Sequence, residues 1–298
     1  MTTTSTRSPA LGVAKAKRNV RRLHHHARPW KANLIGLIFS LVWIFPVYWM
    51  INTAFKPRFE VMTATPIFIP QHPTLDNFIA AITQSTFLIN LRNSVIVVLG
   101  TLVLSMALAL FASAALTRFH FRGRRTIMVV ILAVQMLPAV ALLIPTFLVF
   151  NSIGLVGNFL GLILAYVASV LPFSIWVLRG FFIAIPVEIE EAAMTDGAST
   201  WRIMWSILFP LVTPGLIATS IFAFIQAWND YIVAYTFMKS QDMYTLPVWL
   251  ASFSTPTTGT DFGGQMAASV LFSLPVMVFF LIIQRNLVSG MSAGAVKG

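Results

Sequence analysis

The stretch NSVIVVLGTLVLSMALALFASAALT, residues 93–117, contains no acidic or basic side chain over 25 residues. About 20 mostly apolar residues are enough to cross a bilayer as an α-helix. Four other long runs also lack Asp, Glu, Lys and Arg: 32–55, 126–178, 203–229 and 262–284. The run 126–178 is long enough for two crossings, and NSIGLVGN (151–158) is a natural break between them.

This pattern predicts an all-α polytopic membrane protein with six transmembrane helices. Only 10% of the 298 residues are charged and 57% are hydrophobic, whereas about a quarter of residues are charged in soluble domains. A basic N-terminal tail (1–31) and a C-terminal tail (289–298) flank the predicted six-helix domain, 32–288. The predicted helices are 32–54, 92–117, 126–150, 159–180, 212–236 and 265–287.

Basic residues predict the orientation, because cytoplasmic loops carry an excess of Lys and Arg. With the N-terminus inside, 16 of the 20 basic residues are cytoplasmic and four are outside. We therefore expect a multi-pass protein in the plasma (cytoplasmic) membrane of a prokaryote, with both termini in the cytoplasm. The net charge of +11 fits attraction to anionic lipid and does not indicate nucleic acid.

No catalytic or metal site is predicted. The chain has no cysteine, and His24, His25 and His26 stand among arginines that would repel a cation. It also lacks the G-x-x-x-x-G-K-[ST] loop that cradles phosphates, so it has no ATP site of its own. We therefore expect a protein that is not an enzyme and binds no cofactor directly.

One short segment stands apart from this apolar chain: EEAAMTDGAST, residues 190–200. Four of the nine acidic residues lie between Glu188 and Asp196, in a loop (183–211) that the topology places in the cytoplasm. Local signals predict two short helices joined by a turn at Gly197, with the second helix stopped by Pro210. Such a slim, acidic hairpin fits a groove with a basic residue on a partner protein; the alternative is a hairpin lying at the lipid headgroups.

The segment EEAAMTDGASTWRIMWSILFPLVTPG (190–215) resembles the EAA loop of ABC importer permeases, with Phe209-Pro210 where the family has L-P. Three more motifs are similar to the carbohydrate-uptake, maltose-type permeases of that family. They are TLDNF (74–78), F-x-x-x-W-N-D-Y (224–231) and QRNLVSGMSAGAVKG (284–298).

The resemblance implies a type I ABC importer permease fold and a subunit that forms half of the pathway of a di- or oligosaccharide importer. It implies three kinds of partner besides the lipid bilayer: a second permease subunit, a cytoplasmic ATPase dimer that hydrolyses ATP with Mg, and an extracytoplasmic sugar-binding protein. The EAA loop would be the coupling helix that inserts into the ATPase. The coupling residues would be Glu190, Glu191, Ala192, Ala193, Asp196 and Gly197, and the ATPase-contacting tail residues Ser292, Gly294 and Lys297.

Polar and aromatic groups near the outer part of the predicted spans are candidates for the solute pathway. Sugars are held by hydrogen bonds and aromatic stacking, but intramembrane Gln and Asn also serve as hydrogen-bond partners between helices. The candidates are Gln135, Gln226, Trp228, Asn229 and Asp230.

Two other functions remain open at this point. One is an ABC permease for a non-sugar solute such as a polyamine or glycerol phosphate, and the other is a six-span secondary carrier or membrane scaffold. The acidic loop separates the second from the first, because a secondary carrier gives no reason for such a docking surface.

Overall fold

The computed structural model describes residues 29–83, 86–255 and 259–294. The chain forms two compact units, Met1–Val47 and Tyr48–Gly298. In the first unit the described part is the beginning of α1 (Pro29–Ala54), which matches the predicted first span and contains Pro46. The last residues of α1 belong to the second unit, which holds all the other elements.

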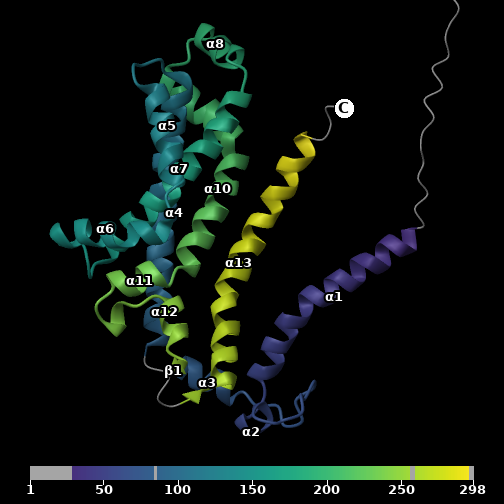
Figure 1. The fold of residues 1–298 in the computed structure, drawn as a ribbon. Coiled ribbons are helices and arrows are strands. Elements are labelled where there is room, and N and C mark those ends of the chain that lie inside the picture. Colours follow the sequence, from purple (N-terminus) through teal and green to yellow (C-terminus); the bar gives the residue numbers. More distant parts are fainter. Residues whose placement is uncertain (1–28, 84–85, 256–258, 295–298) are drawn as a thin grey trace, which may run out of the picture. The chain divides into compact units, whose positions relative to one another are not determined.

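The second unit is mainly helical (Figure 1). Its two strands, β1 (Ser254–Thr255) and β2 (Gly259–Thr260), form one short antiparallel pair in which Ser254 faces Thr260. A π-helical turn, η1 (Met204–Leu208), and a 3₁₀ turn, η2 (Gln241–Met243), lie between α-helices. The α-helices are α2 (Arg58–Val61), α3 (Asp76–Thr83), α4 (Phe87–Arg118), α5 (Arg124–Gln135), α6 (Ala139–Ser152), α7 (Phe159–Ala184), α8 (Glu188–Thr195), α9 (Thr200–Ile203), α10 (Phe209–Asn229), α11 (Ile232–Phe237), α12 (Leu246–Ala251) and α13 (Phe262–Gly294).

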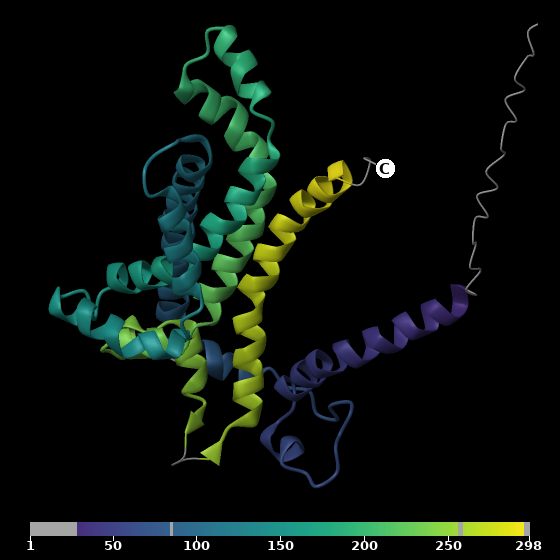
Figure 2. The same ribbon diagram turned by 45° about the horizontal axis from the view of Figure 1, so that its top comes forward.

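Three long helices, α4, α7 and α10, pack against one another at the centre of this unit (Figure 2). A line of small, fully buried residues runs along α4 at a spacing of four, and such residues let membrane helices approach closely. Gly100 on α4 and Gly215 on α10 mark the tightest contacts with α7. A Cβ on them would come within 2.7 Å of Ile163 and 2.5 Å of Phe181, respectively. The line on α4 consists of Val97, Thr101, Ser105, Ala109 and Ser113.

Among the described residues, five helices are long and apolar enough to cross a membrane, and α5 with α6 makes a sixth if the bent pair is one span. The prediction of one helix over 126–150 is wrong, because α5 and α6 meet at 107°. Pro138 explains the break: it has no N–H for a helical bond, and it pushes the residue before it out of the helical region. Figure 1 shows α6 projecting sideways from the bundle.

The fifth and sixth spans also differ from their predicted limits. The fifth helix runs from Thr200 to Asn229 rather than over 212–236, and α11 is separate. The sixth, α13, begins at Phe262 and stays helical to Gly294.

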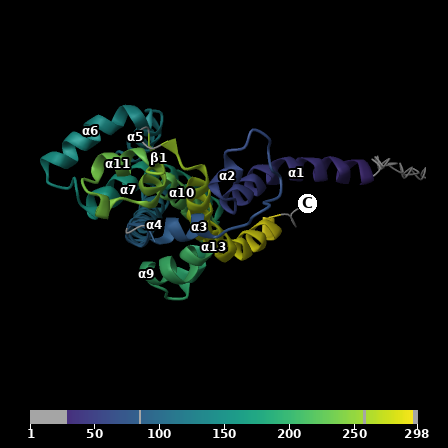
Figure 3. The same ribbon diagram turned by 90° about the horizontal axis from the view of Figure 1, so that it is seen from below.

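The two ends of the second unit carry different structures. At one end, the hairpin end, α8 and α9 follow the C-terminus of α7. At the other, the loop end, residues 55–75, α3, α12 and the β pair lie near the start of α13, and Figure 3 shows α3 beside α13 there.

Candidate functional site

The acidic segment folds as a helical hairpin, as its local signals predict. Helix α8 has all three of its glutamates in its first turn, where the helix dipole favours negative charge. Ser199 caps α9, and its hydroxyl oxygen accepts a hydrogen bond from the backbone N–H of Arg202 at 3.3 Å.

The turn between the two helices requires a glycine. Gly197 has a φ of +80°, the left-handed conformation that L side chains disfavour. Its N–H donates to the carbonyl oxygen of Met194, and the N–H of Ala198 donates to that of Ala193, each at 3.0 Å. This pair of bonds is a Schellman motif, which satisfies the last carbonyls of α8. The predicted turn at Gly197 is confirmed.

An ion pair attaches this hairpin to the helical bundle. Glu190 points inward, and its carboxylate lies 2.5 Å from Nε of Arg118, the last residue of α4. Only 10% of the Glu190 side chain and 13% of the Arg118 side chain are exposed. The guanidinium also donates to the carbonyl oxygen of Ile185, 3.1 Å away, just before α8. Arg118 therefore fixes both the acidic residue and the chain that leads to it.

The other acidic residues of the hairpin face outward. Glu188, Glu191 and Asp196 are exposed, as is Ala192, while Ala193 is half-buried against the apolar cluster beneath the hairpin. Exposed apolar side chains stand among the acids: Val187, Ile189 and Met194. This mixture of negative charge and apolar area is suited to a protein surface that offers both a cation and a hydrophobic groove.

Helix α9 does not stop at Pro210, so that prediction is wrong. The π turn η1 comes first, and in it the N–H of Phe209 bonds to the carbonyl oxygen of Met204, five residues back. A π turn widens the helix locally, and Pro210 then occupies the first turn of α10, where its missing N–H costs little. The hairpin is thus continuous with the fifth span.

The large apolar side chains of α9 and η1 point to two different sides. Met204 and Leu208 are buried in the cluster beneath α8, whereas Trp201 and Trp205 are 65% and 50% exposed. The two indoles pack edge to face with ring centroids 5.9 Å apart, and Trp201 also stacks on Phe111 of α4. Two exposed tryptophans, Trp201 and Trp205, therefore lie beside the hairpin.

The family model described as "Binding-protein-dependent transport system inner membrane component" matches residues 105–293. This chain belongs to that family. The matched residues run from the middle of α4 to near the end of α13 and include the whole acidic hairpin. The membrane-spanning helices and this membership make the chain a multi-pass permease component.

Curated relatives of this permease are transport subunits. The diacetylchitobiose uptake system permease protein DasC of Streptomyces coelicolor is 38% identical over 91% of this chain and 98% of its own length. The trehalose transport system permease protein SugB of Mycobacterium tuberculosis is 34% identical over 86% of this chain and 93% of its own.

The fold has a solved counterpart. A chain of a bacterial ABC transporter involved in the import of the acidic polysaccharide alginate superimposes with a TM-score of 0.76, covering 86% of this permease and 95% of that chain. Its sequence identity is 22%, so the likeness concerns the fold. The type I importer permease fold predicted from the sequence is confirmed.

The permease's predicted pathway residues occupy two separate places. Gln135 is exposed at the end of α5, where the bent pair breaks. The other four lie within Gln226–Asp230, at the loop end of α10. There Trp228 is only 2% exposed and stacks on Phe224 in the main core, so it serves packing.

Asp230 is occupied by contacts within the chain. One of its carboxylate oxygens accepts a hydrogen bond from the Tyr166 hydroxyl at 3.0 Å and from the N–H groups of Val233 and Ala234 at 2.9 and 3.1 Å. It thus caps α11 and ties it to α7. Gln226 and Asn229 are exposed, and the Asn229 amide donates to the carbonyl oxygen of Ile225. The role of all five residues in transport stays a prediction.

The predicted C-terminal contact residues lie at and beyond the end of α13. Ser292 and Gly294 are on the helix itself, whereas Lys297 lies outside the described residues. The three histidines of the N-terminal tail lie outside them too. Among the residues that the structure does describe, no group of three His, Cys, Asp or Glu side chains could hold a metal ion.

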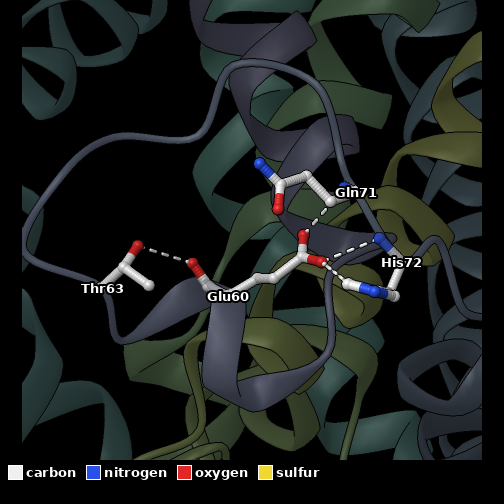
Figure 4. A network of polar contacts seen from close by, with 4 residues as sticks. All are labelled: Glu60, Thr63, Gln71 and His72. Atoms are coloured by element: carbon white, nitrogen blue, oxygen red, sulfur yellow. Dashed lines mark hydrogen bonds and ion pairs between the residues drawn. The ribbon is translucent and has the colours of Figure 1, made fainter.

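A polar clasp that the sequence did not indicate closes the loop after α1 (Figure 4). Glu60, 4% exposed, accepts hydrogen bonds from the backbone N–H groups of Gln71 and His72 at 3.1 and 2.8 Å. Nδ1 of His72 lies 2.8 Å from the same carboxylate, and Thr63 donates to the carbonyl oxygen of Glu60. Burial alone would raise the pKa of Glu60, but these bonds together lower it below its ordinary value.

The TLDNF motif forms a second set of polar contacts at the loop end. The Asn77 amide donates to the carbonyl oxygens of Ala54 at 2.9 Å and Lys56 at 2.8 Å. Lys56 is buried over the ring of Trp49, and this burial lowers its pKa. Asn77 therefore joins the end of α1 to α3.

Proposed function

We propose that this chain is the permease subunit of an ATP-driven, binding-protein-dependent importer of di- or oligosaccharides. It would form half of the translocation pathway and contain no ATP site. The observation that carries this proposal is the hairpin of α8 and α9. Its three outward acids stand on a support fixed to the membrane bundle by the Arg118–Glu190 pair.

The hairpin would transmit force between the ATPase and the bundle. Glu191 would pair with a basic residue in the ATPase cleft, and Ala192 and Ala193 would allow close approach. Gly197 and Asp196 would hold the turn. Because the α9–η1–α10 helix is continuous, a displacement of the hairpin would reach the fifth span directly.

The orientation in this proposal places the hairpin end in the cytoplasm of a prokaryote and the loop end outside. The excess of basic residues on the hairpin side supports it. Both termini would then be cytoplasmic, and Ser292, Gly294 and Lys297 would reach the ATPase. Partner subunits would bind and hydrolyse ATP with Mg.

Names of relatives support a di- or oligosaccharide as the solute. Diacetylchitobiose and trehalose stand in the names of the two relatives above, and "trehalose/maltose" in that of a third, the permease protein MalG of Thermococcus litoralis, 32% identical. A second permease, a pair of ATPase subunits and an extracytoplasmic binding protein would complete the transporter. The second solved neighbour, with a TM-score of 0.61, is the alginate transporter in complex with a periplasmic protein.

The test is a charge reversal on the outward face of α8. Glu191→Lys is expected to abolish co-purification of the ATPase subunits and uptake of radiolabelled maltose, trehalose and diacetylchitobiose in cells that express the whole transporter. Since Glu191 is exposed, the variant should still fold and insert.

Glu188→Lys is the matched comparison, because Glu188 is also exposed and lies three residues earlier on the same helix. As a change to another of the outward acids it should weaken both activities, but less than Glu191→Lys does. If Glu191→Lys keeps both the ATPase association and the uptake, the assignment of the hairpin as the coupling site is wrong.

A further inference from the structure

A cavity of about 560 Å³ lies at the loop end, and its lining includes none of the five residues predicted for the solute pathway. Its walls come from the start of α4, from α11, from η2 and the residue after it, and from α12. The lining residues are Thr86, Asn90, Tyr231, Tyr235, Gln241, Tyr244, Val248, Trp249, Ala251 and Ser252. This volume is in the range of small-molecule sites.

Tyrosine rings form one wall of the cavity. Tyr231 and Tyr235 stack with ring centroids 5.5 Å apart and an angle of 13° between their planes. The ring centroid of Tyr244 lies 6.0 Å from that of Tyr235. Tyr231 is 40% exposed and Tyr235 54%, so both offer an apolar face and a hydroxyl to a ligand. A sugar ring presents the matching surface, with C–H groups on its faces and hydroxyls around its edge.

A buried amide in the wall has unused hydrogen-bonding capacity. Asn90 is 2% exposed, and its Oδ1 has no hydrogen-bond partner among the described residues. Leaving such a group unsatisfied is unfavourable. An amide can meet a hydroxyl as donor or as acceptor, so an entering hydroxyl group would satisfy it. Thr86, Gln241 and Ser252 add further polar groups around the same space.

The wall is held in place by buried hydrogen bonds. The Asn93 amide, fully buried, donates to the carbonyl oxygens of Asp242 at 2.7 Å and Tyr244 at 3.0 Å. The hydroxyl of Ser94 accepts from the N–H of Leu246 at 2.7 Å. These bonds fix the segment that carries Gln241 and Tyr244 to α4. A preformed wall binds a ligand without the cost of ordering it.

The lack of charged residues in the cavity lining favours some solutes over others. None of the ten lining residues is Asp, Glu, Lys, Arg or His. A polyamine would find no carboxylate and a phosphate ester no cation, and a desolvated charge without a partner is costly. Neutral, hydroxyl-rich molecules satisfy these groups best.

We propose that this cavity is a subsite that receives a neutral sugar residue before it enters the bundle. The proposal rests on the proposed import function, and it adds which residues of this permease first touch the solute.

The test uses the absence of cysteine from the chain. Ala251→Cys places a thiol in the cavity, and Thr236→Cys is the control on α11, partly exposed and outside the lining. Complete transporters in proteoliposomes are labelled with a membrane-impermeant maleimide, with and without the binding protein. Maltose, trehalose and diacetylchitobiose are the probes, and spermidine and glycerol 3-phosphate are the charged comparators.

At least one neutral sugar should slow labelling at Ala251→Cys several-fold without the binding protein, and should leave Thr236→Cys unchanged. Protection by spermidine or glycerol 3-phosphate instead, or by no solute, overturns the subsite. Slowing that needs the binding protein and occurs equally without sugar also overturns it, because the cavity would then be a protein-docking surface.

A second variant tests the tyrosine wall. Tyr235→Ala should lower uptake at limiting sugar about three- to tenfold, as expected for one lost aromatic contact, while ATPase co-purification stays unchanged. Uptake equal to that of the wild type would count against the subsite alone. If the wild-type transporter takes up none of the three sugars, the import function fails, and the labelling result still decides what the cavity binds.

Discussion

Replacing the buried carboxylate of Glu190 should release the hairpin from the bundle. Glu190→Gln keeps the size of the side chain and removes its charge, so the Arg118 guanidinium is left nearly buried without its counter-charge. It would retain the hydrogen bond to the carbonyl oxygen of Ile185. The outward face of α8 would be chemically unchanged.

The size of this effect follows from the geometry of the pair. Opposite charges 2.5 Å apart attract by about 6–7 kcal/mol at an effective dielectric constant of about 20. The cost of desolvating both groups offsets much of this. Removing one partner of a buried pair typically costs about 3–5 kcal/mol. Since roughly a tenth of each side chain reaches solvent, we expect about 2–4 kcal/mol.

Amide hydrogen exchange measures this loss locally. In the purified permease, exchange of residues 188–198 should accelerate roughly 30-fold to several hundred-fold in Glu190→Gln, since about 1.4 kcal/mol corresponds to a factor of ten. Exchange in the core of α4 should not change. Glu191→Gln is the matched control and should stay within about threefold of the wild type, because Glu191 is exposed.

A double-mutant cycle separates the pair from its surroundings. Arg118→Met combined with Glu190→Gln removes both charges, and it should be less destabilised than the sum of the single variants by at least about 2 kcal/mol. Wild-type exchange in Glu190→Gln, or equal acceleration in Glu191→Gln, would refute the conclusion that Glu190 anchors the hairpin.

Three further predictions concern the turn, the loop clasp and the helix packing. Gly197→Ala should cost about 1–2 kcal/mol by the same exchange measurement, since an added Cβ meets no atom within 4 Å and only the left-handed backbone is strained. Because its bonds lower the pKa of Glu60 below its ordinary value, the clasp should hold at neutral pH and open only at a pH below that ordinary value, which is about 4.3 for glutamate. Limited proteolysis at neutral and acidic pH would show this opening, and Glu60→Gln should be cleaved at both. Gly161→Ala should lower thermal stability strongly because its Cβ would collide with the carbonyl oxygen of Leu155, whereas Gly180→Ala on the same helix, with open space around it, should not.

The spans were predictable because hydrophobicity is a local property of the chain. A helix that crosses lipid must be apolar along its length, so uncharged runs locate α1, α4, α7 and the start of α13 to within a few residues. Hydropathy does not predict where an apolar segment bends. The segment 126–150 is uniformly apolar, and only the geometry at Pro138 turns it by 107°.

Pro210 illustrates the opposite error, a local rule that longer-range structure overrides. A proline usually ends a helix. Here the π turn before it supplies the space that its ring needs, and the buried side chains of Met204 and Leu208 gain by continuing the helix into α10. Only knowledge of what packs beneath the hairpin could have favoured that outcome.

The acidic hairpin was recognisable from sequence, but the roles of its acids were not. Glu190 and Glu191 are adjacent and identical, and both looked like docking residues. They differ because Glu190 forms an ion pair with Arg118, which lies 72 positions earlier in the sequence. No local sequence pattern predicts such a contact. The only indication in the sequence was the cluster of basic residues in 118–125, which lies on the same predicted side of the membrane as the hairpin.

Rigid attachment combined with an exposed acidic face suits the force-transmitting role proposed for the hairpin. An exposed acidic helix on a flexible tether would bind a partner but would absorb its movement. A rigid helix without exposed acids would lack the charged groups that bind the partner. Here Glu190 and the Schellman turn make the hairpin stiff, the π turn joins it to α10, and Glu188, Glu191 and Asp196 remain outside. A variant that loosens the anchor while sparing the outer acids should therefore still bind the ATPase but uncouple ATP hydrolysis from uptake.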